Sequence, residues 1–250
     1  MVITNKAPFS VICGDCLDLM ADMPDGEVDL LFTDLPFGTT KCKWDTPVDL
    51  DRFWELARRV VKPDGAVVLF AQTPFDKVLG MSNIDDLRYE WIWEKTEATG
   101  HLNAKRMPMK AHENILVFYR KLPTYNPQKT TGHTRKVSTA AHKRNCLKSD
   151  CYGEYGNTSY DSTERYPRSV IRGPTDKQKG ITGVAVKPVW LCEKIVLTYS
   201  NPGEVVLDCC MGSGSIGVAC MNTDRQYIGM ELDEMRFAFA QKRLYTHANT

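Results

Sequence analysis

The sequence predicts an α/β fold in which helices cover both faces of a parallel sheet. Apolar runs of strand length alternate with amphipathic segments of helix length, which is typical of parallel strands joined by helices. This pattern stops between residues 123 and 183, where Gly, Ser, Thr, Tyr, Lys and Arg dominate, and then returns. We therefore predict one domain of residues 1–122 and 184–250, interrupted by an insertion of residues 123–183. With 250 residues, 42% of them apolar, the chain can bury a full core.

The order of the elements follows from the apolar period and from the Pro and Gly residues between them. Before the insertion we expect a strand at 10–13, a helix at 16–23, a strand at 28–33, a helix at 50–61, and strands at 66–70, 89–93 and 114–119. Turns are expected at 24–26 and 62–65. After the insertion we expect a helix at 187–200, a strand at 204–207, a helix after Gly214, a strand at 226–230 and a helix at 233–244.

The charge of the chain is unevenly distributed. Residues 95–180 hold 17 Lys and Arg against 7 Asp and Glu, a net charge of +10, whereas the remainder holds 15 against 24, a net charge of −9. A basic segment on an acidic scaffold predicts that a polyanion binds at one face.

The sequence also predicts a cytoplasmic protein with free thiols. No stretch has the roughly 18 apolar residues of a membrane span, and the amino terminus lacks a secretion signal. Nine cysteines in a reducing compartment are expected to stay reduced. The pair Cys13 and Cys16 has no second pair, so no metal is expected there. The insertion holds four further possible zinc ligands whose spacing matches no common module: His133, His142, Cys146 and Cys151.

The first functional motif is a glycine turn between a strand and a helix, at residues 205–217. Gly212 and Gly214 let a ligand approach the backbone where a Cβ would clash, and Glu231 can accept hydrogen bonds from both ribose hydroxyls. This arrangement predicts a nucleoside site. The glycine spacing through Gly217 also fits a dinucleotide fingerprint, so a nicotinamide oxidoreductase is an alternative. Against it, the 19 residues after Glu231 are too few for the downstream strands of that fold.

The second motif, at residues 33–38, directly follows a buried strand and is expected at the carboxyl edge of the sheet, where α/β proteins bind ligands. An aromatic amine is a poor nucleophile because its lone pair is delocalised into the ring. Acceptors for both N–H groups free that lone pair, and Asp34 and the Leu35 carbonyl can supply them. Phe37 offers a face on which a base rotated out of a duplex can stack.

Both motifs resemble those of the exocyclic amino methyltransferases of DNA. Residues 34–37 are similar to the family's Asp-Pro-Pro-Tyr/Phe catalytic motif, and residues 208–214 resemble its Asp-Pro-Phe-x-Gly-Ser-Gly motif for S-adenosylmethionine (AdoMet). Residues 14–18, 187–188 and 228–231 resemble further segments of the family. The order of catalytic motif, variable region and cofactor motif is that of the β class. It implies a circularly permuted, Rossmann-like methyltransferase sheet that continues from the carboxyl-terminal helix to the amino-terminal strand.

The resemblance implies roles for individual residues. The methylation pocket would consist of Asp34, Leu35, Pro36 and Phe37. The cofactor contacts would be Asp15, Lys187, Asp208, Gly212, Ser213, Gly214 and Glu231. The chain departs from the family pattern at two places: Leu35 replaces a proline but keeps the carbonyl, and Cys209-Cys210 replaces Pro-Phe, which removes an aromatic wall near the methionine moiety.

The insertion occupies the place of the β-class target-recognition region, which implies double-stranded DNA as a partner. Cationic side chains neutralise phosphates, and arginines can read guanine edges. The expected DNA contacts are Lys105, Arg106, Arg135, Lys136, Lys143, Arg144, Arg165, Arg168 and Arg172. Lys95 and Lys110 are expected to approach the DNA backbone or the flipped base, and a local structural role is expected for His112-Glu113.

These observations predict transfer of a methyl group from AdoMet to adenine N6 of DNA, with base flipping. Asp34 at the first motif position favours adenine, since Ser is usual there for cytosine N4. Cytosine N4 is the first alternative, followed by an NAD-dependent oxidoreductase and a non-catalytic DNA-binding module, and RNA remains an alternative substrate. β-class relatives are often dimers, so a homodimer is expected, and a cognate restriction endonuclease is a candidate partner.

Overall fold

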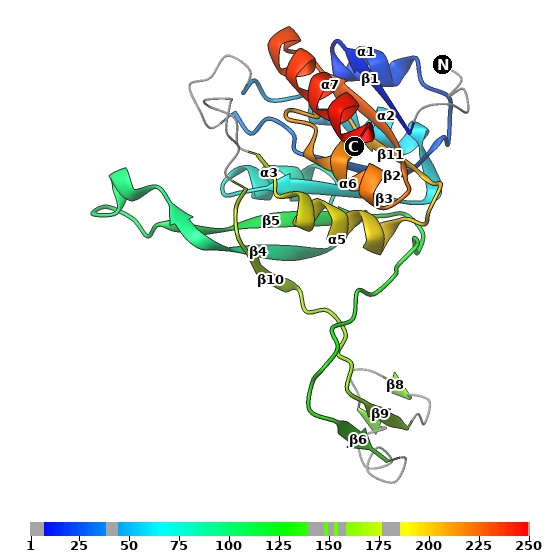
Figure 1. The fold of residues 1–250 in the computed structure, drawn as a ribbon, viewed down its shortest axis with the longest axis vertical. Helices are drawn as coiled ribbons and strands as arrows, with labels where there is room; N and C mark the ends of the chain where they lie inside the picture. The colour runs from blue at the N-terminus through cyan, green and yellow to red at the C-terminus, as the bar shows by residue number, and fades with distance from the viewer. Residues whose placement is uncertain are drawn as a thin grey trace. The chain divides into compact units, whose positions relative to one another are not determined.

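The computed structural model describes residues 8–38, 45–139, 148–149, 153–154, 159–176 and 186–249. Within these residues an eight-stranded sheet runs in the order β1-β12-β11-β2-β3-β5-β4-β10 (Figure 1). Its strands are β1 (Phe9–Cys13), β2 (Val28–Thr33), β3 (Val61–Ala71), β4 (Leu87–Thr99), β5 (Lys110–Phe118), β10 (Val170–Gly173), β11 (Val205–Asp208) and β12 (Gln226–Glu231). A short 3₁₀ turn, His101–Asn103, lies between β4 and β5.

Helices cover both faces of the sheet, as predicted. One face packs against α1 (Cys16–Ala21), α2 (Leu50–Val60) and α3 (Phe75–Ser82), and the other against α5 (Val189–Tyr199), α6 (Ser215–Asn222) and α7 (Glu234–Ala248). In β2, Leu31 joins the core of the first face while Leu30 and Phe32 join that of the second. This alternation follows from the two-residue period of a strand. No helix in the described part of the chain has the length and apolar character needed to cross a bilayer.

The strands nearest the two ends of the described chain are neighbours in the sheet. β1 pairs in parallel with β12, from Phe9 opposite Tyr227 to Cys13 opposite Glu231. The last strand in the sequence is therefore the neighbour of the first, which confirms the predicted permuted order. Asp233 begins α7 as an N-cap, accepting hydrogen bonds from the backbone N–H groups of Met235 and Arg236 at 3.0 Å each.

The structure differs from the prediction in the second half of the sheet. The sheet is mixed, because β5 runs antiparallel to both β3 and β4. Residues 62–65, expected as a turn, lie inside β3, where a register shift opposite Val28 and Leu30 accommodates them. α3 was not predicted, since eight residues give little more than two turns of period.

The chain forms two compact units, Met1–Asn126 with Ser169–Thr250, and Pro127–Arg168. The second is narrower than residues 123–183, because β10 pairs with β4 and belongs to the main sheet. Within the second unit β6 (Lys136–Ser138) pairs with β9 (Tyr160–Ser162), and β7 (Lys148–Ser149) pairs with β8 (Gly153–Glu154).

A buried hydroxyl ties α5 to β4. The Tyr199 hydroxyl accepts a hydrogen bond from Trp91 Nε1 at 2.6 Å and donates one to the Tyr89 hydroxyl at 3.0 Å. Tyr199→Phe leaves the buried Trp91 N–H without its hydrogen-bond acceptor, so we expect the free energy of unfolding to fall by about 1–3 kcal/mol in urea titrations. Tyr89→Phe is the matched control, because Tyr89 is 39% exposed and the Tyr199 hydroxyl keeps Trp91 satisfied. Equal losses in the two variants would contradict this account.

Candidate active site

A cavity of about 580 Å³ opens at the carboxyl ends of the parallel strands β1, β2, β11 and β12. Parallel strands of a sheet end at one edge, so the loops that follow them meet there. The lining residues include Gly14 to Leu17 after β1, Asp34 to Phe37 after β2, Cys209, Cys210 and Gly212 after β11, Glu231 to Asp233 at the end of β12, and also Gln72, Glu113 and Lys187. The two motifs, at residues 33–38 and 205–217, therefore line one cavity.

Asp34 has two carboxylate oxygens in different surroundings. Oδ2 lies 2.8 Å from Lys187 Nζ. Oδ1 is buried and accepts no hydrogen bond from any residue that the structure describes. A buried polar atom left without its partner costs about 1–3 kcal/mol. Because Asp34 lines the cavity, its Oδ1 is an acceptor for which a bound ligand can supply the donor.

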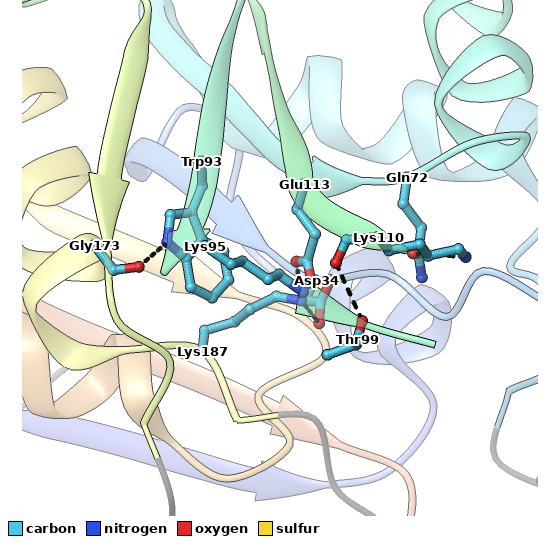
Figure 2. Close-up of polar contacts among 9 residues, drawn as sticks. All are labelled: Asp34, Gln72, Trp93, Lys95, Thr99, Lys110, Glu113, Gly173 and Lys187. Atoms are coloured by element: carbon cyan, nitrogen blue, oxygen red, sulfur yellow. Dashed lines mark hydrogen bonds and ion pairs between the residues drawn. The ribbon is translucent and has the colours of Figure 1, made fainter. Parts of the chain in front are cut away.

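Asp34 ends a chain of four alternating charges (Figure 2). Lys187 Nζ also lies 2.9 Å from Glu113 Oε2, and Lys95 Nζ lies 2.5 Å from Glu113 Oε1. The side chains of Lys187, Glu113 and Lys95 are only 9–10% exposed. The four formal charges sum to zero, so this group of four side chains carries no net charge when Asp34 is ionised.

The charge chain sets the protonation of its members. Burial disfavours the charges of Glu113 and Lys187, but their mutual attraction and the other partners outweigh it, so the pKa of Glu113 is lowered and that of Lys187 is raised. For Asp34 burial prevails over Lys187, and its pKa is raised above the usual range of an aspartate. A reaction that needs the Asp34 carboxylate should therefore lose rate, as pH falls, at a higher pH than for an ordinary aspartate.

Packing holds the rest of the motif in place. The Leu35 side chain is buried, and the Phe37 ring stacks on Phe75 with centroids 5.1 Å apart and an interplanar angle of 28°. Gly38 ends the motif with a φ of +66°, and its N–H donates to Asp45 Oδ1 at 2.8 Å. The ring of Phe37 remains partly exposed and lines the cavity.

The predicted cofactor residues divide into two groups. Gly212, Glu231, Asp15 and Lys187 line the cavity. Gly212 has a φ of +50°, and a Cβ added there would meet no atom within 4 Å, so the backbone borders open space. Its N–H donates to Glu231 Oε2 at 2.9 Å, which fixes the carboxylate. Asp15 accepts a hydrogen bond from Leu17 N at 2.8 Å as the N-cap of α1.

The other three cofactor residues lie behind this wall. Asp208 is 1% exposed and accepts hydrogen bonds from the hydroxyls of Thr33, at 2.7 Å, and Tyr227, at 3.1 Å. Ser213 is buried and contacts Arg243, whose Nη1 donates to the Ser213 carbonyl at 3.0 Å. Gly214 has a φ of +75° at the start of α6 and packs against α7. The contacts of these three residues hold the glycine turn in place.

The ionisation of Asp208 should make the free energy of unfolding depend on pH. Burial raises its pKa to about 7, from 3.8 for a free aspartate. The unfolded chain therefore ionises first, and the stability present below pH 4 is lost as pH rises to about 7, with a slope of at most about 1.4 kcal/mol per pH unit. We expect the unfolding free energy of the wild type, relative to Asp208→Asn, to fall between pH 5 and 7 and then to level off. A constant difference from pH 5 to 8 would contradict the prediction.

The predicted DNA contacts differ in their surroundings. Lys143 and Arg144 lie outside the described residues, as do His142, Cys146 and Cys151 of the possible zinc set. Exposed cations are found at Lys105, Arg106, Lys136 and Arg168. Three of the arginines have partners within their own unit: Arg135 pairs with Asp161 at 2.5 Å, Arg172 pairs with Glu94 at 3.5 Å, and Arg165 donates to the Ser162 and Glu164 carbonyls.

The contacts of two residues could not be foreseen from the sequence. Lys95, expected to approach the DNA backbone or the flipped base, has a side chain only 10% exposed and pairs with Glu113 across the neighbouring strands β4 and β5. Glu113, expected to have a local structural role, lines the cavity and contacts Lys187. No local pattern marks either residue, since their meeting depends on the order of strands in the sheet. Lys110 is exposed, and its Nζ lies 3.2 Å from Gln72 Oε1.

Known proteins share this sequence pattern. A family model described as DNA methylase, N6_N4_Mtase, matches residues 28–242. The Type II methyltransferase M.HpaI of Haemophilus parainfluenzae is 25% identical, over 96% of this chain and 75% of its own length. The Type II methyltransferase M1.MboII of Moraxella bovis is 27% identical, over 88% of this chain and 90% of its own length.

Solved structures share the fold. M1.HpyAVI in its complex with SAM superposes with a TM-score of 0.62 at 22% identity, covering 94% of this chain and 98% of that chain. The PvuII DNA methyltransferase, which is cytosine-N4-specific, superposes with a TM-score of 0.66 at 14% identity, covering 98% of this chain and 92% of that chain. At such identities the likeness applies to the fold alone.

Proposed function

This chain belongs to the DNA methylase family of N6 and N4 methyltransferases, and from that membership we propose that it methylates adenine N6 in double-stranded DNA with AdoMet as the methyl donor. The observation that carries the proposal is the buried Asp34 Oδ1, which lacks a donor among the described residues and belongs to a residue of the cavity wall. An exocyclic amine carries two N–H donors, and one of them would complete the hydrogen bonding of Oδ1.

The chain's own residues can activate the amine. Asp34 Oδ1 accepts one N–H and the Leu35 carbonyl accepts the other, which frees the nitrogen lone pair. When bound, AdoMet supplies an electrophilic methyl group. As the nitrogen gains positive charge, the Asp34 carboxylate stabilises that charge at a partly buried site, where electrostatic interactions are strong. The raised pKa of Asp34 also suits it to accept the proton that the amine releases.

Phe37 is proposed to hold the base. A base inside a duplex cannot reach the cavity, so it must rotate out of the stack and find a new stacking partner. Phe37 lines the cavity with a ring already held against Phe75. Lys187 Nζ lies 5.9 Å from the centroid of the Phe37 ring, which restricts the position of the ring further.

The open wall of the cavity fits the nucleoside part of AdoMet. Gly212 offers backbone without a Cβ, and Glu231, held by the N–H groups of Gly212 and Asp233, keeps free lone pairs for ribose hydroxyls. Asp15 borders the same wall and is proposed to contact the adenine. Asp208, Ser213 and Gly214 hold the turn that positions this wall.

Exposed cationic side chains support the assignment of the DNA contacts. Residues 123–183 are proposed as the target-recognition region, in which the exposed Lys136 and Arg168 bind phosphates. Outside this region, the exposed Lys105 and Arg106 are proposed to lie nearer the flipped base. We further propose that the protein acts in the cytoplasm of a bacterial or phage-infected cell, as a homodimer and beside a cognate restriction endonuclease.

The test is mass spectrometry of nucleosides from unmethylated duplex DNA incubated with the protein and AdoMet. N6-methyladenine supports the proposal. N4-methylcytosine keeps the mechanism but replaces the base, and it is the second candidate because the family includes both activities. Methylated bases in RNA alone would replace the substrate, and DNA binding without any methyl transfer would favour a non-catalytic module.

A further inference from the structure

Three cysteine thiols to which we assign no role in methyl transfer lie together on the wall of the cavity. Cys16 is the first residue of α1, and Cys209 and Cys210 follow β11. Their Sγ atoms all lie within 4.8 Å of one another. Cys209 is buried, whereas Cys16 and Cys210 are partly exposed, and all three line the cavity. The other described cysteines, Cys13, Cys192 and Cys220, lie outside this thiol cluster.

The three sulfur atoms form a set of soft ligands on one wall of the cavity. A thiolate, rather than a thiol, is the form that binds metal ions, so a cation that binds at these sulfurs displaces the thiol protons.

We propose that Cys16, Cys209 and Cys210 bind a thiophilic d¹⁰ cation such as Zn²⁺, and that the bound ion competes with the methyl donor. At a Zn–S distance of about 2.3 Å, tetrahedral geometry places sulfurs roughly 3.8 Å apart, so the cluster needs to contract by no more than about an ångström. Three sulfurs leave a fourth position for water, as in zinc sites with an open coordination position. Binding releases protons from the thiols to solvent and involves no redox step.

Competition follows from the position of the cluster. Cys209 and Cys210 stand three and two residues before Gly212, on the wall to which we assign the nucleoside of AdoMet, and Cys16 follows Asp15. A hydrated ion at these sulfurs would occupy space in the same cavity. This half of the inference rests on the proposed function, whereas metal binding by the three thiols does not.

The metal site is tested by titrating the reduced, metal-free full chain with Cd²⁺ and following the ultraviolet thiolate-to-metal charge-transfer band. Cys16→Ser and Cys210→Ser each remove one partly exposed ligand and should weaken the tightest Cd²⁺ site at least about tenfold. Cys13→Ser is the matched control, an exposed cysteine three residues away, and should bind like the wild type. Equal affinity in all four proteins, or no charge-transfer band in the wild type, would overturn the site.

Competition is tested by equilibrium dialysis of AdoMet with and without one equivalent of Zn²⁺, each protein being compared with itself. We expect the dissociation constant of AdoMet to rise at least about tenfold in the wild type and in Cys13→Ser, and to change little in Cys16→Ser. An unchanged constant in wild type that holds Zn²⁺ would overturn the competition. Failure to bind AdoMet even without metal would overturn the proposed function, and the Cd²⁺ titration would still decide on the metal site.

Discussion

Asp34→Ala should lower kcat for methyl transfer at least about a thousandfold while leaving AdoMet binding within a few-fold of wild type. The substitution removes the Oδ1 acceptor and the charge that faces the reacting nitrogen. Lys187 keeps Glu113 as a partner, so the fold should persist. The residues proposed to bind AdoMet, Gly212 and Glu231, are untouched. Single-turnover methylation and AdoMet dialysis measure the two effects separately.

Asp34→Asn separates the acceptor from the charge. An amide carbonyl can still accept an N–H, but it neither neutralises the developing positive charge nor takes up a proton, so we expect a loss intermediate between wild type and Asp34→Ala. An Asp34→Ala enzyme that keeps more than a tenth of wild-type kcat would rule out Asp34 as the group acting on the amine. Loss of AdoMet binding in Asp34→Ala would instead show that the substitution disturbed the part of the cavity wall that we assign to AdoMet.

Lys187→Met should have the largest effect on stability, a loss of about 3–5 kcal/mol. It removes the cation between two carboxylates, Asp34 at 2.8 Å and Glu113 at 2.9 Å, in a site where the lysine is only 9% exposed. Without Lys187, one of the two carboxyl groups can avoid the cost of a buried, unpaired negative charge by binding a proton. Asp34 should take it, because Glu113 retains Lys95 at 2.5 Å.

The pH profile distinguishes this role from a purely structural one. Because Lys187 lowers the pKa of Asp34, its removal should move the acidic limb of the kcat profile to higher pH. Lys242→Met, at an exposed lysine of α7, is the matched control and should change neither the profile nor the stability. A less stable Lys187→Met protein with an unshifted profile would show that Lys187 supports the fold without tuning Asp34.

The elements and both motifs could be predicted because their signals are local. Residues 28–33 are apolar apart from Asp29 and Thr33, as expected of a strand buried on both faces, and the structure has β2 at the same residues. Residues 205–217 hold an apolar run, glycines and a helical segment in direct succession, and they form β11, the turn and α6. The permuted order was predictable only through the resemblance, which places the catalytic motif before the cofactor motif.

Local patterns in the sequence are enough to locate along the chain the groups that we propose for the chemistry, above all Asp34, Phe37, Gly212 and Glu231. Which distant side chains meet them depends on the tertiary structure. Lys187 reaches both Asp34 and Glu113, and Cys16 reaches Cys209 and Cys210, because the order of the strands brings these segments together at one edge of the sheet. Backbone hydrogen bonds between strands are alike whatever the side chains, so this order arises from packing of the whole core and leaves no local trace.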